Sequence, residues 1–158
     1  ASKDISGYEL DPDVLYNRLV ELAAKVPAGS EGVVFDPLFT GSRSNPLANA
    51  AIREITPGTF TPGHMARSLF EAMASHLADS YREAAKLGAG ERSILVGSGN
   101  AVKLNPVLRD SLEAEFGMPL QLGNNNEEAA IGAALCAAVA DGAFASIAKA
   151  SASFSSGN

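Results

Sequence analysis

Glycine and small polar residues follow a short apolar run near the middle of the chain. The run covers residues 94–96, and the four residues after it are Gly97, Ser98, Gly99 and Asn100. Because glycine has no Cβ, the backbone there can take a positive φ and let a flat ring or a phosphate approach closely. Serine and asparagine add short hydrogen-bonding groups. The spacing therefore predicts a loop, called the notch below, that can hold a nucleotide.

The residues after the notch begin a helix in a recognisable way. Asn105 is followed by Pro106, which combines a side-chain cap with the residue favoured at the first helical position. A dinucleotide-binding fingerprint needs a third glycine where Val102 stands, and the sequence has no Gly-Lys-Ser or Gly-Lys-Thr phosphate loop. The local pattern leaves two interpretations open: a nucleotide-binding loop, or a tight strand-to-helix turn without a ligand.

The composition is that of one ordinary globular domain. The chain has 158 residues, of which 46% are hydrophobic and 19% charged, and its formal net charge is −6. This charge argues against a nucleic-acid partner, which needs a basic face. No apolar run approaches the length of a membrane span and no secretory signal pattern is present, so we expect a cytoplasmic protein without a membrane partner. Cys136, the single cysteine, stands among alanines and is expected to be buried.

Helical periodicity predicts the elements that position the notch. We expect a first helix from Pro12 and a long helix from Pro62, which follows the cap Thr61. A third helix is expected from Pro106 to residue 116, and a last one, made of small residues, from about residue 126 to residue 142. In the long helix one stripe is expected to form the core: Met65, Leu69, Met73, Leu77 and Tyr81.

Short apolar runs at residues 32–39, 94–96 and 119–122 predict strands, and Pro37 confines the first of them to a sheet edge. Strands that alternate with helices predict an α/β fold with a parallel portion. In such sheets ligands gather beyond the carboxyl ends of the strands. The notch and the polar loop at residues 123–126 both follow a strand, so we expect them at the same sheet edge.

Several segments, taken in order, resemble the FGGY family of carbohydrate kinases. Ala-Ala-Ile-Arg-Glu-Ile at residues 50–55 and His-Met-Ala-Arg-Ser-Leu-Phe-Glu at residues 64–71 match the family's C-terminal signature at all but one defined position. Residues 41–46 look like its Gly-Glu-Arg-x-Pro loop, the notch like its Gly-Gly-Gly adenine loop, and residues 128–134 like its closing helix. The resemblance covers roughly residues 32–141.

The resemblance implies an actin-like, ribonuclease-H-like ATPase domain with a mixed sheet and packed helices. It implies a kinase that moves the γ-phosphoryl of ATP to a sugar hydroxyl, with a ketose such as sedoheptulose as the expected acceptor and with Mg²⁺ bound to the nucleotide. Gly97, Ser98, Gly99 and Asn100 would lie against the adenosine, and Asn105 would add an amide contact to the base. In the family the aspartate base and most sugar contacts lie upstream of the matching residues. We therefore assign no catalytic residue and no metal ligand, and expect this chain alone to be inactive.

The same resemblance divides the chain. Residues 1–10 are expected to be a linker or a cloning remnant, residues 11–150 part of a C-terminal nucleotide-binding domain, and residues 151–158 a disordered tail. The sugar would be bound through an N-terminal domain. An apolar face left uncovered without that domain would favour self-association.

Two positions depart from the family pattern. Ala50 and Glu54 stand where the family usually has glycine, so a Cβ and a negative charge would oppose a phosphate contact there. A non-catalytic interaction or regulatory module that retains the actin-like fold is therefore an alternative. A dinucleotide-dependent dehydrogenase is disfavoured by Val102.

Other polar residues have simpler explanations than catalysis. His64 and His76 have no neighbouring metal ligands in the sequence pattern, so a surface or capping role is expected. Arg43 is expected to anchor its loop, and Asp36, beside a proline, to serve a turn.

Overall fold

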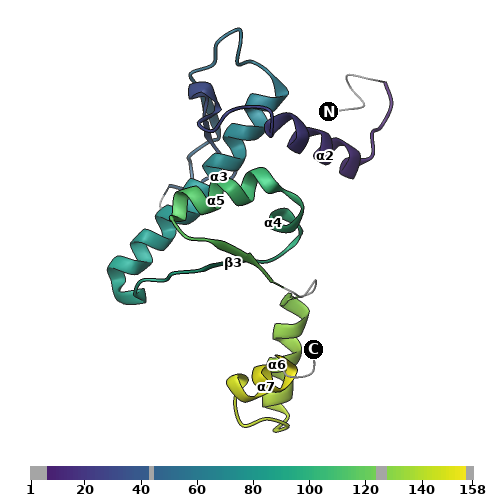
Figure 1. Cartoon of the computed structure of the whole chain (residues 1–158), viewed down its shortest axis with the longest axis vertical. Coiled ribbons are helices and arrows are strands. Elements are labelled where there is room, and N and C mark those ends of the chain that lie inside the picture. The colour runs from purple at the N-terminus through teal and green to yellow at the C-terminus, as the bar shows by residue number, and fades with distance from the viewer. Residues whose placement is uncertain (1–6, 43–44, 124–127, 156–158) are drawn as a thin grey trace.

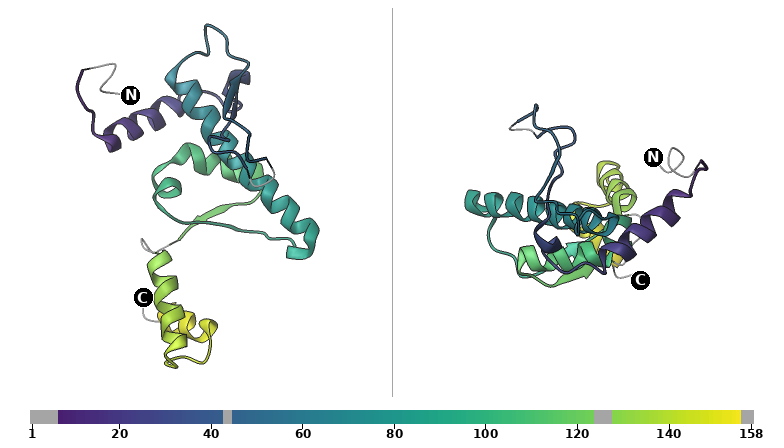
Figure 2. Two further views of the ribbon diagram at one scale, coloured as in Figure 1. Left: turned by 180° about the vertical axis from the view of Figure 1, so that it is seen from behind. Right: turned by 90° about the horizontal axis from the view of Figure 1, so that it is seen from above.

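The computed structural model describes residues 7–42, 45–123 and 128–155, as mixed helix and short strand (Figure 1). The helical elements and strands are, in chain order, α2 (Pro12–Ala23), η1 (Ser30–Gly32), β1 (Val34–Asp36), β2 (Ala51–Arg53), α3 (Pro62–Ala84), η2 (Ala85–Ala89), β3 (Leu95–Gly97), α4 (Asn100–Leu104), α5 (Pro106–Phe116), β4 (Leu120–Leu122), α6 (Glu128–Ala140) and α7 (Ile147–Ser155). Figure 2 shows from behind and from above how α3 crosses α5 and how α2 meets α3.

The helices begin where the capping residues place them. Asp11 Oδ1 accepts a hydrogen bond from the backbone N–H of Asp13 at 2.8 Å, and Thr61 Oγ1 accepts one from His64 at 3.3 Å. Such side-chain acceptors satisfy N–H groups that have no partner inside the helix. The predicted starts of α2, α3 and α5 are confirmed. The end of α5 is also confirmed, because Gly117 has a left-handed backbone with φ 62°.

The core lies where α2, α3 and α5 meet. Its buried residues are Val20, Ala23, Ala66, Phe70, Ala74, Val107, Leu108 and Leu112. The predicted core stripe of α3 is wrong in part: Met73 is 38% exposed and Leu77 55% exposed. The α3 face marked by Ala66, Phe70, Ala74 and Ala78 is buried instead. Small alanine side chains let neighbouring helices approach closely, so tertiary packing selected the face with the smaller residues.

The strands form two short pairs. β3 and β4 are parallel, with Gly97 opposite Leu122, which confirms the predicted parallel portion. β1 and β2 are antiparallel, with Phe35 opposite Ile52. β2 was not predicted, because three residues are too few to show an alternating pattern. Within the described ranges each strand pairs with one neighbour, so β1 is an edge strand, as Pro37 predicted.

The two C-terminal helices, α6 and α7, pack against each other (Figure 1). Two expectations fail here. Cys136 is exposed. The sequence could not show this, because an alanine-rich helix is apolar all round and its residues do not mark an inner face. Residues 151–155 belong to α7 rather than to a disordered tail, while Ala150 of the same helix is 1% exposed. In the part of the chain that the structure describes, no helix combines the length and apolar character needed to cross a membrane.

Candidate functional site

The notch is the turn between β3 and α4. Gly99 precedes α4 and has φ 82°, so the predicted positive φ is confirmed at this glycine. The same prediction is wrong for Gly97, whose φ is outside the left-handed region. Gly97 is buried, and a Cβ there would come within 2.8 Å of Val102 Cγ1 and 3.1 Å of Leu120 Cδ2. The first glycine is therefore needed for packing and the second for backbone conformation.

The remaining notch residues face solvent. Ser98 and Asn100 are exposed, and Gly99 is half-buried. A Cβ placed on Gly99 would meet no atom within 4 Å, so there is open space in front of it. The structure thus brings the backbone of Gly99 and two short polar side chains together at the carboxyl end of β3. This is the arrangement expected of a binding loop in a parallel sheet.

A cavity of about 470 Å³ opens beside the notch. Its walls come from α2 and α4, and its lining residues are Asp13, Tyr16, Asn17, Asn100, Ala101 and Leu104. Ligand pockets of this size bind small molecules, with an apolar lining and a few polar groups that fix orientation. The carboxylate of Asp13 and the amide of Asn17 can accept hydrogen bonds from hydroxyl and amino groups. Sequence reasoning missed the α2 residues, because only the tertiary structure brings α2 to the cavity that α4 also lines.

A second cavity of about 300 Å³ is lined by the residues of β3 and by Ser98 of the notch. Gly97 and Ser98 line it together with apolar side chains of α3, α5 and the two parallel strands, among them Leu77 and Phe116. Because its walls are apolar apart from Ser98, this cavity is less suited than the first to a polar nucleoside.

Asn105 does not reach either cavity. Its side chain is 0% exposed, with Oδ1 accepting from the backbone N–H of Leu108 at 3.0 Å and Nδ2 donating to the Tyr16 hydroxyl at 3.2 Å. A fully buried side chain has no surface with which to touch a base. Asn105 caps α5 and joins it to α2, so the structure gives it a supporting role in place of the predicted base contact.

The second predicted loop meets the notch at its first residue. The backbone N–H of Gly123 donates to the carbonyl of Gly97 at 2.9 Å, so the two loops leave the sheet side by side. Residues 124–126 of that loop, the predicted start of the last helix at about residue 126, and Arg43 lie outside the described residues.

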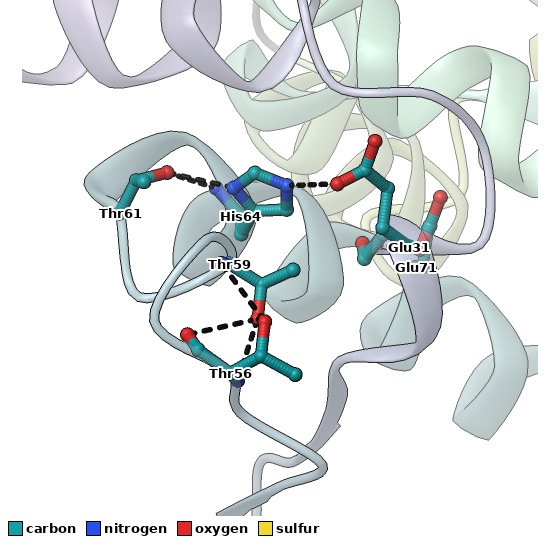
Figure 3. Close-up of polar contacts among 7 residues, drawn as sticks. Glu31, Thr56, Thr59, Thr61, His64 and Glu71 are labelled. Atoms are coloured by element: carbon teal, nitrogen blue, oxygen red, sulfur yellow. Dashed lines mark hydrogen bonds and ion pairs between the residues drawn. The ribbon is translucent and has the colours of Figure 1, made fainter.

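Residues 64–71, called the signature segment below, lie in the first turns of α3, and the side chain of His64 contacts the side chains of Thr61 and Glu31 (Figure 3). His64 Nδ1 lies 2.7 Å from Thr61 Oγ1, and His64 Nε2 lies 3.1 Å from a carboxylate oxygen of Glu31. The ring therefore joins the start of α3 to the η1 turn, in agreement with the expected capping role. His76 is exposed, and among the described residues no three His, Cys, Asp or Glu side chains are placed so that they could hold a metal ion.

Glu71 also contacts the η1 turn. Its carboxylate accepts hydrogen bonds from the Gly29 backbone N–H at 2.9 Å, from Ser30 Oγ at 2.7 Å and from Arg67 Nε at 2.7 Å. Ser30 and Glu31 both have φ 50°, which costs of order 1–3 kcal/mol at a non-glycine residue. This set of contacts, called the Glu71 clamp below, keeps a strained left-handed turn in place.

Asp36 ends β1 and lines a cavity of about 490 Å³ together with Glu71, Asp79 and Glu115. Its Oδ1 atom is buried and has no hydrogen-bond partner among the described residues. The cavity lies between β1 and α3, away from the residues that line the cavity beside the notch. Asp36 does not line the cavity beside the notch.

Comparison with known proteins places these features in a family. Residues 4–140 match the FGGY family of carbohydrate kinases, C-terminal domain. The chain therefore belongs to the FGGY family of carbohydrate kinases. It is 27% identical to sedoheptulokinase of Homo sapiens over 129 residues, and 27% identical to that of Mus musculus over 131 residues. The match covers 82% of this chain but 26% of each relative, so the chain spans about a quarter of their length.

Solved structures of the same class share the fold. A xylulose kinase from Rhodospirillum rubrum aligns with a TM-score of 0.63 and 25% identity, covering 77% of this chain and 24% of that protein. A Plasmodium falciparum glycerol kinase with ADP aligns with a TM-score of 0.67 and 22% identity, covering 88% of this chain and 27% of that protein. The fold is therefore that of these actin-like kinases, as predicted.

One residue that departs from the family pattern has an unusual backbone conformation. Glu54, which stands where the family usually has glycine, has φ 60°. Among the described non-glycine residues such a left-handed backbone occurs elsewhere at Ser30 and Glu31, and Ala50 is not one of them. Position 54 thus keeps the backbone conformation that favours glycine although a glutamate occupies it.

Proposed function

We propose that this chain is the nucleotide-binding part of an ATP-dependent carbohydrate kinase, and that the notch and the α2 wall receive the adenosine of ATP or ADP. The supporting observation is the cavity of about 470 Å³ that joins Asn100 and Ala101 of α4 to Asp13 and Asn17 of α2. Gly99 lets the ligand approach the backbone, and Ser98 and Asn100 supply hydrogen bonds. Asn105 supports the site by donating a hydrogen bond to the hydroxyl of Tyr16, which lines the cavity.

The acidic side chain in this cavity suggests how a nucleotide lies in it. A carboxylate repels phosphate and accepts hydrogen bonds from a ribose hydroxyl or a base amino group. The nucleoside therefore faces Asp13, and the phosphates point away from α2. Phosphoryl transfer depends mainly on positioning and on charge stabilisation by magnesium, which in this proposal is bound to the nucleotide and not to a side chain of this chain.

The acceptor proposed for the whole kinase is a ketose such as sedoheptulose. The similarity to the two sedoheptulokinases supports it. The aspartate base would come from the start of the same domain, upstream of the matching residues, and most sugar contacts from the N-terminal domain, so we assign no catalytic residue among the residues named here. We therefore expect this chain by itself to release no ADP from ATP in the presence of sedoheptulose. ADP release above the rate without protein would contradict that assignment.

Nucleotide binding is tested by titrating ADP into the protein in a calorimeter. We expect a dissociation constant in the millimolar range or tighter. The Ala101→Trp variant places a large ring at the cavity wall and should weaken binding by about tenfold or more, which is about 1.4 kcal/mol. Ala84→Trp is the matched control, because Ala84 is exposed near the end of α3 and does not line this cavity. Absence of heat at millimolar ADP would contradict binding by the chain alone.

A second candidate function is a family member that has lost catalysis and serves as an interaction or regulatory module. The observation that favours it is the pair Ala50 and Glu54, which replace the usual glycines on the phosphate side. This candidate predicts that ADP binds no more tightly than adenosine, because the phosphates gain nothing. If the chain is part of a working kinase, ADP should bind more tightly than adenosine. Titration with each of the two ligands therefore distinguishes the two candidate functions.

A further inference from the structure

The helix α4, which begins at the last notch residue, Asn100, is short and has no buried residue. α4 has five residues, none of them buried, and no side chain caps its N-terminus. Helices shorter than about 12 residues are marginal in water without tertiary support. Yet Asn100, Ala101 and Leu104 of this helix form one wall of the cavity beside the notch. Apart from Val102, which packs against the core, contacts from outside α4 must therefore fix its position.

Arg109 of α5 makes such contacts. Its Nη1 atom donates to the carbonyl of Val102 at 3.0 Å and to the carbonyl of Lys103 at 2.7 Å, in a partly buried setting. These carbonyls belong to the last turn of α4, where helical carbonyls lack partners within the helix. A cation at this end is also favoured by the helix dipole. One guanidinium thus satisfies two acceptors of a helix whose N-terminus has no side-chain cap.

Arg109 stands on a part of α5 that is packed in the core. Arg109 lies in the first turn of α5, and its backbone N–H donates to the carbonyl of Asn105 at 3.2 Å. Val107 and Leu108, beside it in the chain, are each 3% exposed and belong to the core. The guanidinium therefore connects α4, which has no buried residue, to the packed core of the molecule.

We infer that Arg109 is a positioning residue for the nucleotide site: it fixes α4 against α5 and so holds Asn100 and Ala101 in the cavity wall. The inference rests on the proposed function for its effect on ADP. It does not rest on that function for its effect on α4. Arg109 itself is not among the residues that line the cavity. Lysine in its place keeps the charge but loses the planar guanidinium, so Arg109→Lys should show an intermediate effect.

The first experiment follows hydrogen exchange of the α4 amides without nucleotide, in the wild type, Arg109→Met and Arg109→Lys. We expect the amide of Lys103, which donates to the Gly99 carbonyl at 3.1 Å, to exchange about tenfold faster in Arg109→Met, since two charge-assisted hydrogen bonds that fix α4 are lost. Amides of α3 should be unchanged, which shows that the fold is intact. Equal exchange of α4 in the wild type and in both variants would overturn the inference.

The second experiment measures ADP affinity in the same proteins. Arg109→Met should weaken ADP binding by about tenfold and Arg109→Lys by less. Arg92→Met is the matched control, because it removes the same charge from an exposed side chain that does not line the cavity. Equal affinities in Arg109→Met and Arg92→Met would overturn the inference. If the wild type binds no ADP, the proposed binding by this chain fails, and the exchange of α4 still decides whether Arg109 positions that helix.

Discussion

The signature segment of α3 and the notch use polar residues in opposite ways. In the signature segment Arg67 and Glu71 are 12% and 23% exposed and bind each other and the η1 turn. In the notch Ser98 and Asn100 are exposed beside open space. The most recognisable motif of the chain thus holds its own fold together, while the shorter and less specific motif faces a cavity. A polar group already bonded inside the protein has little left to offer a ligand.

The supporting contacts of the two regions also differ in kind. The Glu71 clamp holds a turn that is strained in its backbone, through several hydrogen bonds to one carboxylate. The notch is supported through α4. Asn105 follows the last residue of α4 and caps α5, and Arg109 donates hydrogen bonds to two carbonyls of α4. Neither residue covers the exposed notch side chains Ser98 and Asn100. Substitutions in the first region should therefore change stability, and those in the second should change ligand binding.

The largest expected effect is that of Glu71→Ala. This change removes three hydrogen bonds, leaves the partly buried Arg67 without its ion-pair partner and releases the strained η1 turn. We expect a loss of about 3 kcal/mol in the free energy of unfolding, measured by urea denaturation. Glu83→Ala is the control, because its ion pair with Lys86 is 68–70% exposed and should contribute less than about 0.5 kcal/mol. Similar losses in the two variants would contradict the structural role of the clamp.

The second prediction separates the two glycines of the notch. Gly97→Ala should cost about 2 kcal/mol, because its Cβ would overlap Val102 and Leu120. Gly99→Ala should cost a similar amount for another reason, since φ 82° with ψ 158° is adopted almost only by glycine. Adding Val102→Ala should recover part of the loss in Gly97→Ala and none in Gly99→Ala, as measured by a double-mutant cycle of thermal unfolding. Equal coupling of both glycines to Val102 would show that packing is not what distinguishes them.

The smallest expected effect is a gain in stability. Glu54 is exposed and left-handed, with φ 60°, so Glu54→Gly removes a strain of about 1–2 kcal/mol and costs about 0.5–1 kcal/mol in backbone entropy. We expect the free energy of unfolding to rise by up to about 1.5 kcal/mol, without loss of ADP affinity. A drop in stability would mean that the glutamate side chain makes a compensating contact.

Local chemistry explains which parts of the fold could be predicted. Thr61 and Asn105 each accept a backbone hydrogen bond three residues ahead, so the helix starts followed from neighbours in the sequence alone. Gly117 ends α5 for a similarly local reason, and the order of strand, helix and strand predicted the parallel pair β3 and β4. The open space before Gly99 likewise agrees with the glycine and small polar residues of the notch.

Two of the failed predictions needed information from distant residues. Met73 and Leu77 fit a core stripe by spacing, but α2 and α5 pack on the alanine face of α3. Asn105 resembles a ligand contact by its place in the sequence, but Tyr16, 89 residues away, occupies its amide. Cys136 fits a buried position by composition, but it is exposed on α6.

The sequence by itself determined the helix caps, the parallel strand order, the conformation of Gly99 and the family, because each depends on residues that are close in the chain or on a motif of fixed spacing. Tertiary structure alone decided that Gly97 serves packing, that Asn105 is buried, and that α2 forms a wall of the candidate site. Burial and the pairing of polar groups depend on which surfaces meet after the chain folds. For that reason the notch was visible in the sequence, and the residues that hold and enclose it were not.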